Sequence, residues 1–238
     1  MKRSIADQSL EELGGRLSVL TRQRKDHIEL DRLLRQLDGA EASTQGRVLL
    51  QIYRLVFPHA FAEEAVLWPV MRRILPDGPE LTLEVEREHQ EVNELVTALE
   101  TTSAEDAGRE RLLARLAEVL REDVRDEEDV LLPRLQEKLG PARLRSLGLA
   151  WEVVRRTAPT RAHPVVARRP PGNVVAAVPL SLLDRLRDLV DAAILRSPER
   201  GPAGLHRLST SLATLAHRVE HLPLMRRGED PSTARAAH

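Results

Sequence analysis

Two segments of this chain repeat one pattern of metal-binding side chains ahead of a proline. The first segment begins with His59 and reaches Glu63 four residues later, and the second begins with Asp123 and reaches Glu127 at the same spacing. Both segments end in a proline, ten residues after their first residue. Residues four apart lie on one face of an α-helix, where they can chelate one ion or bridge two. The repeat therefore predicts a metal site shared between two helices.

The composition favours helices that pack through aliphatic side chains. Charged residues make up 31% of the 238 residues and aromatic residues only 2%, with leucine, alanine and arginine recurring at helical intervals. The chain has no cysteine, which excludes disulfides, thiolate metal sites and cysteine nucleophiles. Any metal must therefore be held by nitrogen and oxygen.

The charge pattern argues against nucleic-acid and membrane partners. The 36 basic residues are interspersed with 37 acidic ones, for a net charge of -1, and no basic block stands out. No apolar run approaches the length of a membrane span or a signal peptide. We therefore expect a soluble, cytoplasmic protein.

Four helical stripes predict an all-α, up-down-up-down four-helix bundle, because short connections join antiparallel neighbours. The stripes span residues 20–37, 52–74, 85–99 and 116–134. Pro58 and Pro69 lie within the second stripe, so we expect a kink or a broken turn there. Each stripe carries at least one metal-capable residue on its apolar face, and the set is His27, His59, Glu63, His89, Asp123 and Glu127.

The rest of the chain divides at a proline-rich stretch. A fifth helix is expected at about residues 142–156. The predicted organisation is a metal-binding domain over residues 1–156, a linker over 157–179, a helical hairpin over 180–227 and a disordered tail over 228–238. Residues 197–202 would join the two helices of the hairpin.

A bound cation explains why carboxylates lie on the core face. Burying Glu63, Asp123 and Glu127 without compensation would cost several kcal/mol per charge, a large share of a domain's stability of about 5–15 kcal/mol. The alternative is that these carboxylates pair with arginines or face water.

The ordered set of residues resembles the hemerythrin-like, HHE cation-binding family. It includes His27 within the segment Lys-Asp-His-Ile-Glu-Leu and His89 within Arg-Glu-His-Gln-Glu-Val, besides the two repeated segments. The resemblance implies a four-helix bundle around a non-haem di-iron centre. By position, three histidines would be terminal ligands and two glutamates would bridge the ions, the residues being His27, His59, His89, Glu63 and Glu127.

The chain departs from the family pattern at two positions. Asp123 occupies the place of the usual fourth histidine. This extra anionic ligand should favour ferric iron, lower the reduction potential and make manganese a plausible occupant, or it leaves the site incomplete. Asn93 stands where the oxygen carriers of the family have a further histidine, which implies more open coordination positions. Glu64 and Glu128 follow the proposed bridges directly and either orient ligands or are solvated.

The resemblance implies a protein that reacts with or senses oxygen, peroxide or nitric oxide. As an enzyme it would consume peroxide or nitric oxide, and as a sensor it would convert the state of the iron into a conformational signal. The alternative is a degenerate structural bundle without a complete metal site.

The predicted hairpin offers two further features. The spacing of His217 and His221 could bind a metal, with His206 about three turns earlier, although such pairs are common on exposed helices. A leucine-rich stripe from Leu205 to Val219 would pack against the bundle or form a homodimer.

Overall fold

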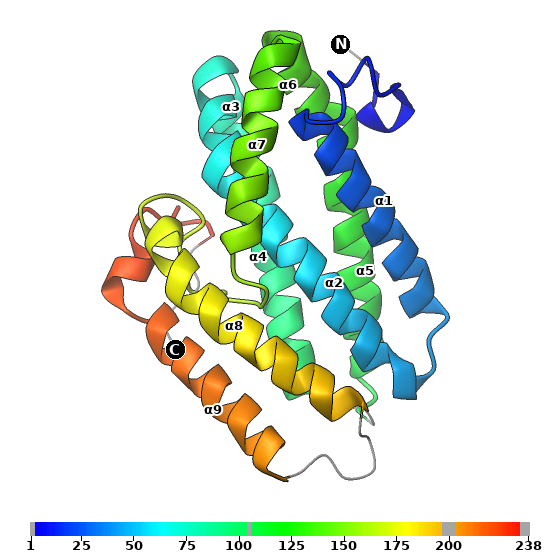
Figure 1. The fold of residues 1–238 in the computed structure, drawn as a ribbon, viewed down its shortest axis with the longest axis vertical. Coiled ribbons are helices and arrows are strands. Elements are labelled where there is room, and N and C mark those ends of the chain that lie inside the picture. Colours follow the sequence, from blue (N-terminus) through cyan, green and yellow to red (C-terminus); the bar gives the residue numbers. More distant parts are fainter. Residues whose placement is uncertain (1–2, 104–105, 197–202, 234–238) are drawn as a thin grey trace.

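The computed structural model describes residues 3–103, 106–196 and 203–233, and these ranges contain helices and turns but no β-strand. This confirms the predicted all-α fold. Four long helices, labelled in Figure 1, form the bundle. They are α1 (Val19–Asp38), α2 (Ala42–Ala62), α4 (Gly78–Thr101) and α5 (Arg109–Asp126).

Two of these helices continue through a π-helical turn. α2 passes through η2 (Glu63–Leu67) into α3 (Trp68–Ile74), and α5 passes through η3 (Glu127–Leu131) into α6 (Leu132–Lys138). In each π turn a backbone N–H reaches the carbonyl five residues back, from Trp68 to Glu63 and from Leu132 to Glu127. The sequence repeat is therefore also a repeat of backbone structure.

The prolines of the repeat account for these turns. Pro69 and Pro133 each occupy the second position of the helix that follows the π turn. A proline has no N–H to donate, and its ring clashes with the carbonyl four residues earlier in a regular α-helix. A wider turn relieves this clash, and such π turns are frequent at functional sites. The break expected at Pro69 thus takes the form of a π turn, whereas Pro58 lies inside α2.

The core consists of two apolar clusters with a polar layer between them. Along α1, Leu20 belongs to one cluster and Leu30 to the other, and His27 lies between them. Along α4, Val85 and Val92 flank His89 in the same way. The predicted ligands are therefore buried at one level of the bundle.

A fifth helix, α7 (Pro141–Thr157), crosses in front of the bundle in Figure 1. It packs against α1 and α2. The contact is close at Gly148, where a Cβ atom would collide with the carbonyl oxygen of Leu17. A glycine at this position allows α7 to reach the start of α1.

The C-terminal part is a pair of helices lying side by side, α8 (Gly172–Arg196) and α9 (Ala203–Glu220), followed by the short η4 (Pro223–Arg226). α8 begins earlier than we expected and contains Pro179, so the linker is confined to residues 158–171. The predicted connection at residues 197–202 lies outside the described residues.

The chain after Gly228 differs from the predicted disordered tail as far as it is described. Gly228 and residues 231–233 lie in turns, Asp230 forms an ion pair with Arg169 at 3.2 Å, and Thr233 is buried. Residues 234–238 lie outside the described residues.

The linker lies along α4 and is held there by charged and polar contacts. Arg161 is buried and pairs with Asp188 at 2.7 Å and with Asp191 at 2.8 Å on α8, and with Glu100 of α4 at 3.2 Å. Further along, Arg169 pairs with Glu86 of α4 at 2.7 Å. The linker therefore joins the bundle to the C-terminal helices.

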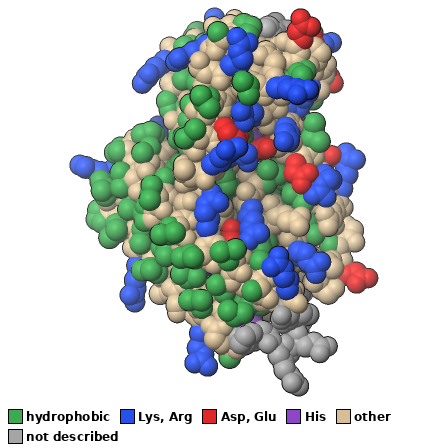
Figure 2. Space-filling view, viewed as in Figure 1, with side chains coloured by type: hydrophobic (Ala, Val, Ile, Leu, Met, Phe, Trp, Pro, Cys, Tyr) green, Lys and Arg blue, Asp and Glu red, His purple; other side chains and the backbone are tan. Residues whose placement is uncertain are grey.

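Apolar side chains are exposed along the outer side of α8. They gather over α8 and α9 in the face shown in Figure 2. In the leucine stripe of α9, Leu208 and Leu215 are also exposed. Among the described helices, none is both long and apolar enough to cross a membrane. The exposed apolar side chains of α8 are Val174, Val175, Val178, Leu182, Leu186 and Leu189.

Candidate metal centre

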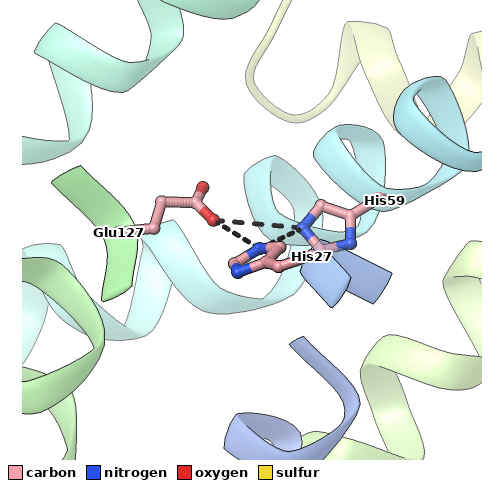
Figure 3. A group of neighbouring side chains, drawn as sticks. All are labelled: His27, His59 and Glu127. Atoms are coloured by element: carbon pink, nitrogen blue, oxygen red, sulfur yellow. Dashed lines mark hydrogen bonds and ion pairs between the residues drawn. The ribbon is translucent and has the colours of Figure 1, made fainter. Parts of the chain in front are cut away.

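Three histidines from three helices meet in the polar layer between the two apolar clusters. Nε2 of His27 on α1 lies 3.3 Å from Nε2 of His59 on α2. Figure 3 shows these two imidazoles with the carboxylate of Glu127, which lies 3.2 Å from Nε2 of His27. His89 approaches the same layer from α4, and all three rings are buried.

Two glutamates lie between the histidines, each at the first position of a π turn. Oε1 of Glu63 is 3.1 Å from Nε2 of His59, and its Oε2 is 3.7 Å from Nε2 of His89. Oε2 of Glu127 is 3.2 Å from Nε2 of His27 and 3.9 Å from Nε2 of His59. Each carboxylate therefore faces two imidazoles, which is the arrangement that a bridging ligand requires.

Asp123, the residue that departs from the family pattern, lies beside His89. Its Oδ1 is 3.5 Å from Nε2 of His89, and the aspartate is buried at the end of α5. The structure thus brings all six predicted site residues together.

The ligand atoms fall into two overlapping groups, each compact enough to hold an ion. One group contains His27, His59 and Glu127, and the other contains Glu63, His89 and Glu127. In each group the ligand atoms lie within 4.8 Å of one another. Glu127 belongs to both groups, so it is the residue best placed to join two ions.

In each of the three histidines of the site, the nitrogen that faces away from the centre, Nδ1, lies close to a carboxylate. Nδ1 of His27 lies 2.9 Å from Glu128, Nδ1 of His59 lies 3.3 Å from Asp26, and Nδ1 of His89 lies 2.9 Å from Glu64. A carboxylate accepts a hydrogen bond, so Nδ1 donates and Nε2 is turned toward the interior.

These outer contacts concern Glu64 and Glu128, which directly follow the two glutamates predicted to bridge the ions. Glu64 contacts His89 and is buried, whereas Glu128 contacts His27 and is only partly exposed, so neither glutamate faces solvent freely. Asp26 was missed by the sequence analysis, although it directly precedes His27. Its partner is a histidine on another helix, and helical spacing within one segment does not show such a contact.

The electrostatics of the site show how costly the buried carboxylates are without a cation. Burial and the charge of Glu127 raise the pKa of Glu63 to about 7. Burial and the same neighbouring charge also raise the pKa of Asp123. Burial opposes ionisation of Glu127 too, but the neighbouring imidazoles of His27 and His59 outweigh it and lower the pKa of Glu127.

The histidines respond in the opposite direction. Burial disfavours a charged His27, but the neighbouring carboxylates of Glu127 and Glu128 outweigh this effect and raise its pKa to about 9. The pKa values of His59 and His89 are also raised by neighbouring carboxylates, despite burial. Protons on the imidazoles thus offset the carboxylates in the protein alone, and a bound cation would take over that role.

Several buried polar atoms of this site have no hydrogen-bond partner among the described residues. Buried polar groups are paired in the great majority of proteins, and an unpaired one needs an explanation. Lone pairs that converge from several helices are what a divalent cation satisfies, so the residues fit a metal. The atoms are both carboxylate oxygens of Glu63 and of Glu127, Oδ1 of Asp123 and Nε2 of His89.

α7 closes the site on the side of His59. The ring of Trp151 meets the His59 ring edge-on, with centroids 5.3 Å apart. The guanidinium of Arg155 lies over the same indole, 5.2 Å from its centroid, and 3.6 Å from Asp26. Neither residue could be predicted from the sequence, because α7 lies outside the repeated pattern.

Asn93 serves the fold and not the ligand set. Its side-chain amide donates to the carbonyl of His89 at 2.8 Å, and its oxygen accepts from the backbone N–H of His163 at 2.9 Å. The position therefore ties the linker to the helix that carries His89.

A small cavity of about 20 Å³ adjoins the site. Its size is that of a single water molecule or a diatomic gas, and several of its walls are apolar. The lining residues are Asp26, His27, Leu30, Leu55, Val56, His59, Ala60, Leu120, Asp123 and Val124.

Comparisons with known proteins agree with this geometry. A family model described as the hemerythrin HHE cation binding domain matches residues 18–135. The chain is 26% identical over 169 residues to an uncharacterised hemerythrin-like protein of Schizosaccharomyces pombe. That alignment covers 70% of this chain and 83% of the relative. No solved structure matches the chain significantly.

Proposed function

Residues 18–135 of this chain belong to the hemerythrin family of HHE cation-binding domains, and on that premise we propose that the chain holds a non-haem di-iron centre. The observation that carries the proposal is the set of buried, unpaired ligand atoms shared by Glu63, Glu127, Asp123 and His89. A pair of bound metal ions would satisfy these atoms together.

In this proposal the two overlapping groups of ligands each hold one ion. His27 and His59 would serve one ion, and His89 with Asp123 would serve the other. Glu63 and Glu127 would lie between the ions, since each carboxylate faces two histidines. When bound, a di-iron centre supplies Lewis acidity and an exchange of electrons with a small oxidant.

Asp123 sets the charge of the centre. Three carboxylates and two divalent ions leave about one positive charge, whereas a histidine in place of the aspartate would leave about two. The more anionic donor set favours the ferric state and makes manganese an alternative occupant.

We further propose that the centre reacts with or senses oxygen, peroxide or nitric oxide. The 20 Å³ cavity beside His27 and His59 supports this, because only a ligand of very few atoms fits. A larger surface pocket of 410 Å³ between α1 and α5 is also lined by His27, Leu30, Leu120 and Val124. Small neutral molecules would pass from this surface pocket into the small cavity, because the two are lined by these same four residues.

An enzyme and a sensor predict different results with hydrogen peroxide. Iron-loaded protein is mixed with peroxide, and both the loss of peroxide and the absorption spectrum are followed. Repeated turnover that is lost in His59→Ala supports an enzyme, whereas one spectral change without turnover supports a sensor. His206→Ala, which removes an exposed histidine on α9, is the matched control.

The competing function is that of a structural bundle without a complete metal site. Ligands that bind only the folded protein stabilise it. A Tm that is unchanged after metal removal by a chelator would support the structural bundle and contradict the di-iron proposal.

We also propose that the C-terminal helices mediate self-association. The support is the exposed apolar side of α8, which includes Val178 and Leu182. A dimer mass in light scattering that becomes a monomer mass in Leu182→Glu would support this proposal, and a monomeric wild-type protein would contradict it.

A further inference from the structure

Two histidines and a glutamate meet at the end of α9, where His217 and Glu220 lie in the last turn of the helix and His221 directly follows it. Nδ1 of His217 lies 3.0 Å from Oε1 of Glu220, and Nδ1 of His221 lies 3.7 Å from the same oxygen. The two imidazole rings have centroids 4.2 Å apart. Ligand atoms of these three residues lie within 4.8 Å of one another. His206, which the sequence placed near this pair, is not in the group.

The glutamate of this group is held in place from behind. Glu220 is buried, and its Oε2 lies 2.9 Å from Nδ1 of His163 in the linker. Nε2 of His163 in turn lies 3.1 Å from Asp184 on α8. One carboxylate oxygen of Glu220 is thus held by a buried histidine, and the other lies near His217 and His221.

The histidines of the group are open to solvent. The side chain of His217 is 68% exposed and that of His221 is 40% exposed. They border a surface pocket of 540 Å³, which His163, Asp184 and Glu220 also line. An ion would reach this group directly, without passing through the bundle.

We propose that His217, Glu220 and His221 form a second divalent-metal site, of the class that binds zinc. Two imidazole nitrogens and one carboxylate oxygen suit a borderline ion such as Zn²⁺, and the open pocket leaves a position for water. His163 acts on the site through Glu220, as carboxylate ligands are held by outer hydrogen bonds in known metal sites. If His221 binds the metal through Nδ1, the bond to the metal replaces the hydrogen bond that Nδ1 donates to the carbonyl of His217.

This arrangement goes beyond the chance occurrence of two histidines on an exposed helix. Two histidines that share this spacing by chance would not be expected to have a buried carboxylate held in a fixed orientation beside them. Here the carboxylate comes from the same turn, and its orientation depends on a linker residue 57 positions earlier in the chain. The linker, α8 and α9 therefore build the site jointly.

The test is zinc titration of the full-length protein by calorimetry, after metal removal. Wild-type protein is compared with His217→Ala and with the double variant His217→Ala, His221→Ala, which change exposed side chains only. The wild type should bind one zinc ion more than the double variant, and His217→Ala should weaken that binding at least tenfold. His206→Ala, an exposed control on the same helix, should match the wild type.

A second variant examines the role of the buried carboxylate. Glu220→Gln keeps the size of the side chain and removes its charge, and it should also weaken the same zinc site at least tenfold. Equal zinc stoichiometry and affinity in the wild type and in the double variant would overturn the proposal. This comparison does not depend on what the bundle centre binds, because that centre is the same in both proteins.

Discussion

Glu64 accepts a hydrogen bond from Nδ1 of His89 across 2.9 Å and is itself buried. Glu63, the preceding residue, faces Nε2 of the same imidazole. Two consecutive glutamates in one π turn therefore contact opposite edges of one histidine, and the first is a proposed ligand while the second fixes the ring.

Replacing Glu64 should weaken metal binding without removing a ligand. Outer-shell substitutions of this kind commonly cost about 10–100-fold in metal affinity, and we expect a loss in that range for Glu64→Gln. Competition with a chelator of known affinity measures it. Glu118→Gln, at a glutamate whose side chain is 60% exposed, is the control. Equal affinities in both variants would show that the contact with His89 does not orient a ligand.

Asp123→His should raise the reduction potential of the iron centre and leave about two metal ions per chain. The substitution removes one negative charge beside His89. Redox titration of the loaded protein measures the potential, and Asp129→His, at an exposed position in η3, controls for a general change of charge. A potential that does not move would mean that Asp123 does not contact the metal.

Arg161→Met should destabilise the attachment of the C-terminal helices. The guanidinium is buried among Asp188, Asp191 and Glu100. Removing one partner of a buried charge cluster commonly costs about 3–5 kcal/mol, because the remaining charges stay buried without compensation. Urea unfolding with limited proteolysis measures the effect, with the exposed Arg207→Met as the control. Unchanged proteolysis in the region of α8 would contradict this account of the linker.

Deprotonation of His163 should lower the free energy of unfolding as the pH rises. Burial opposes its charge, but Asp184 and Glu220 outweigh burial and raise its pKa from 6.5 to about 9. The folded protein thus holds the proton more tightly than the unfolded chain. The stabilisation is complete below about pH 6.5 and is lost as the pH rises through about 9, with an upper limit of about 3 kcal/mol.

The measurement is the free energy of unfolding of chelator-treated protein between pH 6 and pH 10, for the wild type and for His163→Gln. The difference between the two proteins should shrink across this interval, since only the wild type has this titrating imidazole. A difference that stays constant with pH would contradict the assigned contacts of His163 with Asp184 and Glu220.

The bundle and its six candidate ligands could be predicted because both follow from spacing within single helices. His27 and His89 interrupt apolar stripes, and the repeat places Glu63 and Glu127 one turn after another potential ligand. These patterns are local, and a helix converts them directly into a shared face.

The parts that escaped prediction depend on contacts between segments far apart in the sequence. Asp26 meets His59, and Trp151 covers the same histidine from α7. The oxygen of Asn93 accepts a hydrogen bond from the backbone N–H of His163 in the linker, a contact that the sequence did not indicate. The π turns also escaped, because proline indicates an interruption of the helix but not its form.

The most direct test of the central claim is the metal content of protein purified without added metal, measured together with its absorption spectrum. The account predicts about two iron ions per chain with near-ultraviolet absorption from iron bound to oxygen, both lost in Glu63→Ala and kept in Glu118→Gln. Substoichiometric metal that iron loading cannot raise, equal in the wild type and in Glu63→Ala, would contradict it.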